Sequence, residues 1–463
     1  GKVVTLRSIS YSLEYQKKYI KHKKMKKVLF FCIALCAITM VKAQETLTLN
    51  QCLQMAIDNN LSLKISRNEV AKGKQTISEN RAKLYPQINA VAQLNDNFTP
   101  PVSVTDGSAY GKSYNVTKTL QYNASAGLQL QMPLYNQMVL TAIDISKTVD
   151  HLNQLSYEKA REDLIVQTAK AYYMAQNTLE QIRLVNDNIK RLEELRDITQ
   201  AFYDNQMSLE VDLKRVNLNI ENLTVQRDNA VAMLDQQYTM LKYVIDYPAD
   251  KAIQVTDMEP AKIEEVKANG LNTGLYELQL LEKKKELTKK QTKLAKDGYL
   301  PTLSLTGSLM YSAFTDKFEH WFHSGDSNHW YGSNGLGLQV RVPIFDGFEK
   351  RSKIRRAKIE EDNARIGYEN ALKGMQANYI NAVSEVNNCQ RNYKKQSDNY
   401  LLAQDVYSVT ADQYKEGVSS MTAVLQDEMR MSEAMNNYLT ACYSYKIANL
   451  SLLKLTGQLD QVK

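Results

Sequence analysis

The chain contains the segment Gly127-Leu128-Gln129-Leu130-Gln131-Met132-Pro133-Leu134-Tyr135-Asn136. A second version follows 210 positions later as Gly337-Leu338-Gln339-Val340-Arg341-Val342-Pro343-Ile344-Phe345-Asp346. Both versions alternate apolar and polar residues up to a proline, and both continue with an apolar residue, an aromatic residue and Asn or Asp. A repeat at this distance indicates a duplicated large unit rather than a short-period solenoid. We therefore divide the chain into two repeats, 44–258 and 259–463, behind an N-terminal segment, 1–43.

Four prolines bracket a polar, alternating stretch in each repeat: Pro86, Pro133, Pro301 and Pro343. Beyond these brackets, residues 134–247 and 344–463 contain no proline. Proline breaks a helix because it lacks a backbone donor and clashes with the preceding turn. We therefore expect long helices in the proline-free regions and expect the four prolines to mark the junctions between strands and helices.

The first proline-free region shows a helical pattern. Between Ile182 and Phe202, apolar residues recur at steps of three and four, with charged and amide residues between them. This narrow apolar stripe is typical of coiled coils. We expect helices over about 138–203 and 348–414, each roughly 100 Å long at ~1.5 Å per residue. Shorter helices are expected ahead of the alternating stretches, over about 49–83 and 275–296.

Each long helix is expected to end at a short break, at 203–208 and at 414–419, and to return as a second helix. The returning helices should run to about residues 247 and 457. Gly417 can adopt the left-handed conformation that ends many helices. Ser208 and Ser419 can cap the returning helices.

The bracketed stretches predict four β-strands because their side chains alternate with a period of two. We expect them over about 86–95, 122–132, 302–311 and 336–342. Their length suits a tilted crossing of a bilayer, and the small polar residues on one face suit a water-filled lumen. Four strands cannot close a barrel, and only closed barrels survive in lipid, so several chains would have to pool their strands. A soluble sheet with one solvated face fits the same alternation.

The strands leave two loops, 95–121 and 312–335. The second loop is rich in aromatic residues, as expected of an interfacial girdle at a membrane surface: Phe314, Phe318, Trp321, Phe322 and Trp330. Its histidines, His320, His323 and His329, are loosely spaced and have no fixed acidic or cysteine partner. We predict no metal site there.

Residues 25–43 have the features of a secretory signal peptide. Met25-Lys26-Lys27 is basic, residues 28–41 are mostly apolar, and Val41-Lys42-Ala43 fits the small-x-small rule for cleavage. An uncleaved membrane anchor is the alternative, although the apolar stretch is short for a membrane span. We interpret residues 1–24 as an extension upstream of the natural start at Met25.

The basic charge of the chain belongs to this N-terminal segment. Residues 1–43 hold ten Lys or Arg and one acidic residue, so the net charge of +7 falls to about −2 without them. Nucleic-acid binding is therefore not predicted. Beyond residue 43 the cysteines are Cys52, Cys389 and Cys442, far apart and without metal-ligand spacing. We expect them to be buried and reduced, although one pair could form a disulfide.

The sequence lacks the common motifs of catalysis and cofactor binding: a glycine-rich phosphate loop, HExxH, CxxC and GxSxG. Its carboxylates lie on polar helical faces. We therefore predict neither enzyme activity nor a cofactor.

In this order and in duplicate, these elements resemble the TolC family of outer-membrane efflux proteins, also called outer membrane factors, over about 46–460. The resemblance rests on the doubled motif Gly-Leu-x-x-x-x-Pro-[Leu/Ile]-[Tyr/Phe]-[Asn/Asp]. It also rests on Tyr85-Pro86, on Tyr299-Leu300-Pro301 and on the doubled helical break. The fold it implies is mainly α with a β-barrel part. Three identical chains would form one twelve-stranded barrel in the outer-membrane lipid and a periplasmic tunnel of coiled-coil hairpins.

The resemblance also implies a function, namely the exit duct of a tripartite efflux pump or of a type I secretion system. A periplasmic adaptor protein and an inner-membrane transporter would be its partners, and solutes would pass through it passively. The alternative is a periplasmic coiled-coil scaffold without a pore, in which the β segments form a soluble cap.

The family's tunnel gate maps onto the two helical breaks. The family pattern is a glycine, an arginine or similar residue two positions on, and an aspartate six positions after the glycine. Gly417 matches in the second repeat, Ser419 stands where arginine is common, and Ala423 replaces the aspartate. In the first repeat Gln206 replaces the glycine, and Asp212 matches the aspartate.

Tyr414 corresponds to the gate tyrosine of the family, and Tyr203 is its counterpart in the first repeat. The resemblance therefore implies five gate or tip residues: Tyr203, Asp212, Tyr414, Gly417 and Ser419. Asp212 is also explained as an ordinary first-turn acid that interacts favourably with the helix dipole. Without the usual arginine, the family's hydrogen-bonded lock is not expected in its usual form.

Overall fold

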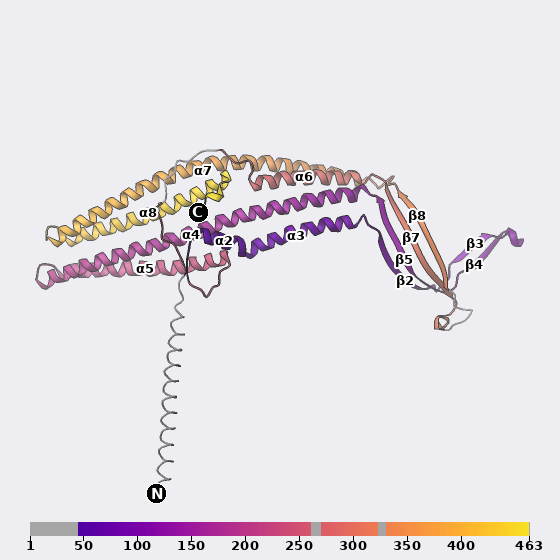
Figure 1. The fold of residues 1–463 in the computed structure, drawn as a ribbon, viewed down its shortest axis with the longest axis horizontal. Coiled ribbons are helices and arrows are strands. Elements are labelled where there is room, and N and C mark those ends of the chain that lie inside the picture. Colours follow the sequence, from indigo (N-terminus) through magenta and orange to yellow (C-terminus); the bar gives the residue numbers. More distant parts are fainter. Residues whose placement is uncertain (1–44, 261–269, 323–329, 463) are drawn as a thin grey trace, which may run out of the picture.

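The computed structural model describes residues 45–260, 270–322 and 330–462. Two long helical hairpins lie side by side, and a four-stranded sheet continues from one end of the helical body (Figure 1). The predicted signal peptide, His323 and His329 lie outside the described residues. None of the helices within the described ranges is both long and apolar enough to cross a bilayer.

The long helices confirm the prediction from the proline-free regions. Helix α4 spans Gln137–Asp204 and helix α7 spans Glu349–Lys415. Each returns after a short break, as α5 (Glu210–Ile245) and α8 (Met421–Thr456). Within the chain α4 packs on α8, so α5 and α7 are the outer helices of the two hairpins (Figure 1).

The shorter helices differ from the prediction at one point. Residues 49–83 form two helices, α2 (Leu49–Asn59) and α3 (Leu61–Ala82), rather than one. Asn60 separates them: its Oδ1 accepts from the Leu63 amide at 3.1 Å, and its Nδ2 donates to the Val244 carbonyl at 2.8 Å. In the second repeat α6 (Tyr276–Asp297) forms as one helix.

The main sheet is antiparallel, in the order β2-β5-β7-β8. Its strands are Gln87–Asp96, Tyr122–Tyr135, Thr302–Thr315 and Trp330–Arg341. Strands β7 and β8 are longer than predicted, since the pairing continues from Thr302 opposite Arg341 to Ala313 opposite Trp330. The sequence Gly332-Ser333-Asn334-Gly335 has weak β-propensity, and here cross-strand pairing overrides it.

Three of the four prolines lie at the predicted junctions. Pro86 and Pro301 immediately precede β2 and β7, and Pro343 follows β8 by two residues. Pro133 instead lies inside β5, which continues to Tyr135 with a register shift between these two residues. Proline is tolerated at such an irregularity because the missing amide proton is not needed for the ladder there. The prediction that β5 ends at residue 132 was therefore wrong.

The first loop contains a hairpin that the sequence did not predict. Strands β3 (Val102–Asp106) and β4 (Tyr114–Lys118) pair with each other and project beyond the main sheet, away from the helices (Figure 1). Turn and polar residues dominate the loop, so the short alternating segments were not recognised.

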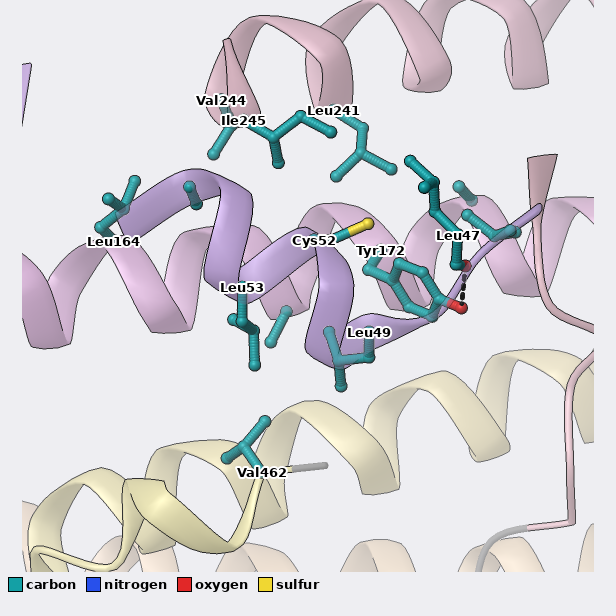
Figure 2. Close-up of a cluster of buried hydrophobic side chains, with 14 of the residues drawn as sticks. Leu47, Leu49, Cys52, Leu53, Leu164, Tyr172, Leu241, Val244, Ile245 and Val462 are labelled. Atoms are coloured by element: carbon teal, nitrogen blue, oxygen red, sulfur yellow. Dashed lines mark hydrogen bonds between the residues drawn. The ribbon is translucent and has the colours of Figure 1, made fainter. Parts of the chain in front are cut away.

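The N-terminal end of the described chain is fixed in a buried core beside α4 and α5 (Figure 2). Strand β1 (Glu45–Leu47) pairs in parallel with β6 (Ile253–Val255). The Tyr172 hydroxyl donates to the Leu47 carbonyl at 2.9 Å. Cys52 is fully buried in this core, and burial raises the pKa of its thiol to about 12. All three described cysteines are buried and free, as predicted.

Candidate functional site at the helical tips

The two hairpin tips share one backbone plan. A residue with positive φ follows each long helix: Gln206 at +61° and Gly417 at +76°. In both tips the next amide donates to the carbonyl five residues earlier, at 2.7 Å in the first tip and 2.8 Å in the second. Glycine adopts this conformation freely, whereas a residue with a side chain costs about 1–2 kcal/mol there. The left-handed conformation of Gly417 is therefore confirmed.

The predicted serine caps were wrong by one position. Leu209 precedes α5 and makes no side-chain cap, so Ser208 does not cap the helix. Ser420, not Ser419, caps α8, and its Oγ accepts from the Ala423 amide at 3.3 Å. The cause is geometric, because the chain needs three residues after the left-handed one before it re-enters a helix. Ser419 is half-buried in this connection.

Tyr414 joins the second hairpin to the first. Its side chain is buried, its hydroxyl donates to Thr199 Oγ1 at 3.3 Å, and its ring packs on Phe202 with centroids 5.7 Å apart. The Thr199 hydroxyl in turn donates to the Leu195 carbonyl at 2.7 Å. The hydroxyl of Tyr414 therefore ties α7 to α4 inside an apolar cluster.

Asp212 contributes to a second contact between the hairpins. It forms an ion pair with Arg215 on the same helix at 3.0 Å, and Arg215 Nη1 also donates to Thr422 Oγ1 of α8 at 3.4 Å. Arg215 is half-exposed, so the ion pair itself adds about 1 kcal/mol or less. Arg215 therefore links the first hairpin to the second, a contact that was not predicted from the sequence.

Tyr203 is placed differently from its counterpart. It lies in the last turn of α4, is exposed, and is not part of the buried cluster around Tyr414. The structure therefore brings Tyr414 and Asp212 to the boundary between the hairpins and leaves Tyr203 at the surface.

A buried polar network lies farther from the tip, between α4 and α8. Ser432 Oγ donates to Glu428 Oε1 at 2.7 Å, Asn188 Nδ2 donates to Ser432 Oγ at 3.1 Å, and Arg191 donates to Asn188 Oδ1. Burial raises the pKa of Glu428, and the bond from Ser432 and the charge of Arg191 offset only part of the rise.

The sequence itself contains a signal for this network. Glu428 stands within the apolar stripe of α8, between Leu425 and Met431, at a spacing that only core residues otherwise occupy there. A carboxylate at such a position indicates a buried polar partner on the neighbouring helix.

Metal-binding side chains are not gathered at the hairpin tips. Across residues 45–260, 270–322 and 330–462, no group of three or more His, Cys, Asp or Glu could hold a metal ion. In the loop after β7, His320 Nδ1 lies 2.9 Å from Asp316.

Known proteins share both the sequence pattern and the fold. The family model described as "Outer membrane efflux protein" matches residues 52–239 and 276–458, once in each predicted repeat. The Outer membrane protein TolC of Escherichia coli is 23% identical over 448 residues, which cover 94% of this chain and 87% of that protein. The Proteases secretion protein PrtF of Dickeya chrysanthemi is 21% identical over 337 residues, which cover 69% of this chain and 68% of that protein.

The fold matches a solved outer-membrane protein. The crystal structure of VceC from Vibrio cholerae superposes with a TM-score of 0.71 at 14% identity and covers 88% of this chain and 96% of that one. At this identity the match shows the fold alone. The family model, in contrast, matches most of the chain in two copies, each containing a helical hairpin. Because the family model matches both repeats, and both repeats have the same arrangement of strands and helical hairpin, the chain belongs to the outer membrane efflux protein family.

Proposed function

We propose that this protein is the outer-membrane exit duct of a tripartite efflux or type I secretion system. Solutes pass through it passively, from a periplasmic adaptor and an inner-membrane transporter to the outside. The feature that supports this most directly is a sheet with two open edges joined to helical hairpins roughly 100 Å long. Such a chain provides a membrane wall and a long periplasmic tunnel, and passive conduction requires neither a catalytic residue nor a cofactor.

The open edges of the sheet support a homotrimer. Strands β2 and β8 lie at its two edges, and β8 is exposed along its whole length. In lipid, unpaired backbone groups cost several kcal/mol each, so the edges must be paired. Three copies contribute twelve strands to one closed barrel, with β8 of each copy beside β2 of the next.

The helices support the same assembly. Helix α5 exposes an apolar stripe at seven-residue spacing, formed by Val211, Leu218 and Val225. Near the tip, α7 exposes Leu402, Val406 and Val409. Stripes of this kind form coiled-coil seams. We propose that α5 of one copy packs on α7 of the next, so that the hairpins close a tunnel.

The contacts between the hairpins suit a gate at the tunnel end. Tyr414 bonds to Thr199, and Arg215, paired with Asp212, bonds to Thr422. When these contacts break, the second hairpin is free to move away from the first. Gly417 and Ser419 shape the tip that an adaptor would contact.

Ion conductance in planar lipid bilayers tests the duct. We expect a small conductance for the purified protein and a larger one after the double substitution Asp212→Ala and Tyr414→Phe. If neither form conducts, the protein is not a duct. Membrane fractionation then tests the scaffold alternative: a scaffold is washed off the outer membrane, whereas a barrel is released only by detergent. A neighbouring gene for a proton-driven transporter would indicate efflux, and one for an ABC transporter would indicate secretion.

A further inference from the structure

The junction between β8 and α7 contains an unusual backbone conformation. Gly347 and Phe348 both have positive φ, at +63° and +67°. This region is disfavoured for a bulky side chain, so Phe348 is a strained residue. The first repeat makes the equivalent junction without strain: Asn136 is extended, its Oδ1 accepts from the Val139 amide, and α4 begins directly after it.

The strained turn exposes an apolar group, which we call the junction knob: Ile344, Phe345 and Phe348. Their exposed fractions are 95%, 76% and 62%, and the two phenylalanine rings pack edge to face with centroids 5.6 Å apart. The equivalent residues of the first repeat, Leu134, Tyr135 and Met138, are only 46%, 40% and 43% exposed. Asp346 fixes the turn, because its Oδ2 accepts from the Lys350 amide at 3.1 Å and pairs with Lys350 Nζ at 2.9 Å.

The position of the knob indicates what covers it. The knob follows the edge strand β8 and precedes the outer helix α7. At the opposite edge of the chain, the junction between α3 and β2 exposes Tyr85 (65%) and Ile88 (67%). Both junctions lie at the helical end of the sheet (Figure 1). If β8 of one copy pairs with β2 of the next, as the proposed function requires, the two exposed surfaces come together.

Membrane lipid is the other possible partner, and the duplication argues against it. Both repeats place this junction at the same end of the sheet, so lipid would surround both junctions equally. The strain and the protruding rings occur only at the junction that follows the edge strand β8, and not at the one that follows the inner strand β5. We propose that the junction knob packs against Tyr85 and Ile88 of a second copy of this chain. This contact holds the copies together where the barrel meets the tunnel.

Disulfide trapping tests the contact directly. The described native cysteines are buried, so a chain carrying Tyr85→Cys and Phe348→Cys should form oxidant-dependent bonds only between copies. We expect bands of two and three chains on non-reducing gels. The matched control carries Tyr85→Cys and Met138→Cys and should remain a single chain. If the protein is trimeric by mass in detergent but forms no linked bands, the proposed contact of the junction knob is wrong. The proposed duct is unaffected by that result.

A second variant measures the energetic contribution of the knob. Phe348→Gly removes the ring and relieves the backbone strain, so it should fold. We expect its trimer to dissociate at a lower temperature than wild type, whereas Met138→Ala leaves that temperature unchanged. An unchanged trimer with weaker insertion into lipid vesicles would assign the knob to lipid and overturn the proposal. A protein that is a single chain in detergent and in membranes would overturn both this contact and the duct.

Discussion

Glu428 is a carboxyl group buried where the two hairpins meet. Arg191 of α4 and Tyr407 of α7 interact electrostatically with it, and Ser432 of its own helix donates a hydrogen bond to it. Glu194 of α4 interacts in turn with Tyr407. Burial raises the pKa of Glu428, and it raises the pKa of Tyr407 to about 12. If the hairpins separate, water reaches Glu428 and its pKa returns toward the ordinary value. The closed arrangement therefore binds this proton more tightly than the open one.

This difference gives a pH dependence with a definite sign. As the pH rises from about 4.3, the ordinary glutamate value, through the raised pKa, the buried carboxyl ionises at a cost and the closed state loses stability. We expect bilayer conductance to increase with pH over this range and expect Glu428→Gln to remove the increase. Glu433→Gln, at an exposed position of the same helix, is the control. A Glu428→Gln protein with the wild-type pH response would show that this network does not couple to opening.

Tyr414 and Tyr203 form a matched pair for the tip contacts. Tyr414→Phe removes the bond to Thr199 from a buried site and should weaken the contact between hairpins by about 0.5–1.5 kcal/mol. Tyr203→Phe removes a hydroxyl from an exposed side chain and should change little. The open probability of single channels measures both. If the two substitutions have equal effects, the Tyr414 hydroxyl does not contribute to the gate.

At the scale of elements, helices and strands with a clear local periodicity could be predicted from the sequence. The apolar stripe from Ile182 to Phe202 predicted α4, and the alternation from residue 122 to 132 predicted most of β5. Such periodicity did not predict the break at Asn60, because that break depends on a carbonyl of α5 that is distant in sequence. The bond between Arg215 and Thr422 could not be predicted for the same reason, because the local sequence of a helix does not show where the other hairpin packs against it.

The break between α2 and α3 can be tested by one substitution. Asn60→Ala removes the cap of α3 and leaves the Val244 carbonyl without its side-chain donor. We expect a local destabilisation of about 1–2 kcal/mol. Hydrogen–deuterium exchange should become faster in α2 and α3, while Asn59→Ala, at an exposed neighbouring position, should leave it unchanged. If exchange is the same in both variants, packing alone sets the break.

At the scale of the whole molecule, the proposed homotrimer would cover the exposed apolar surfaces of the chain. Its exposed apolar stripes lie on α5 and α7, the outer helices of the two hairpins. Leu218 lies eight residues after the start of α5, and Val406 lies nine residues before the end of α7. At ~1.5 Å per residue, both are therefore about 12–14 Å from the tip. In the proposed trimer these two side chains approach each other across the seam between copies.

Leu218→Asp should therefore prevent assembly, because each trimer would bury three carboxylates without partners, at several kcal/mol each. The mass of the detergent complex measures this, with Asn217→Asp on the same helix as the control. Adding Val406→Lys to Leu218→Asp supplies the missing partner only if α5 of one copy meets α7 of the next. We expect the double variant to recover trimers that neither single substitution forms well. If the lysine brings no recovery while Leu218→Asp alone blocks assembly, the copies meet at this height through a different pair of faces.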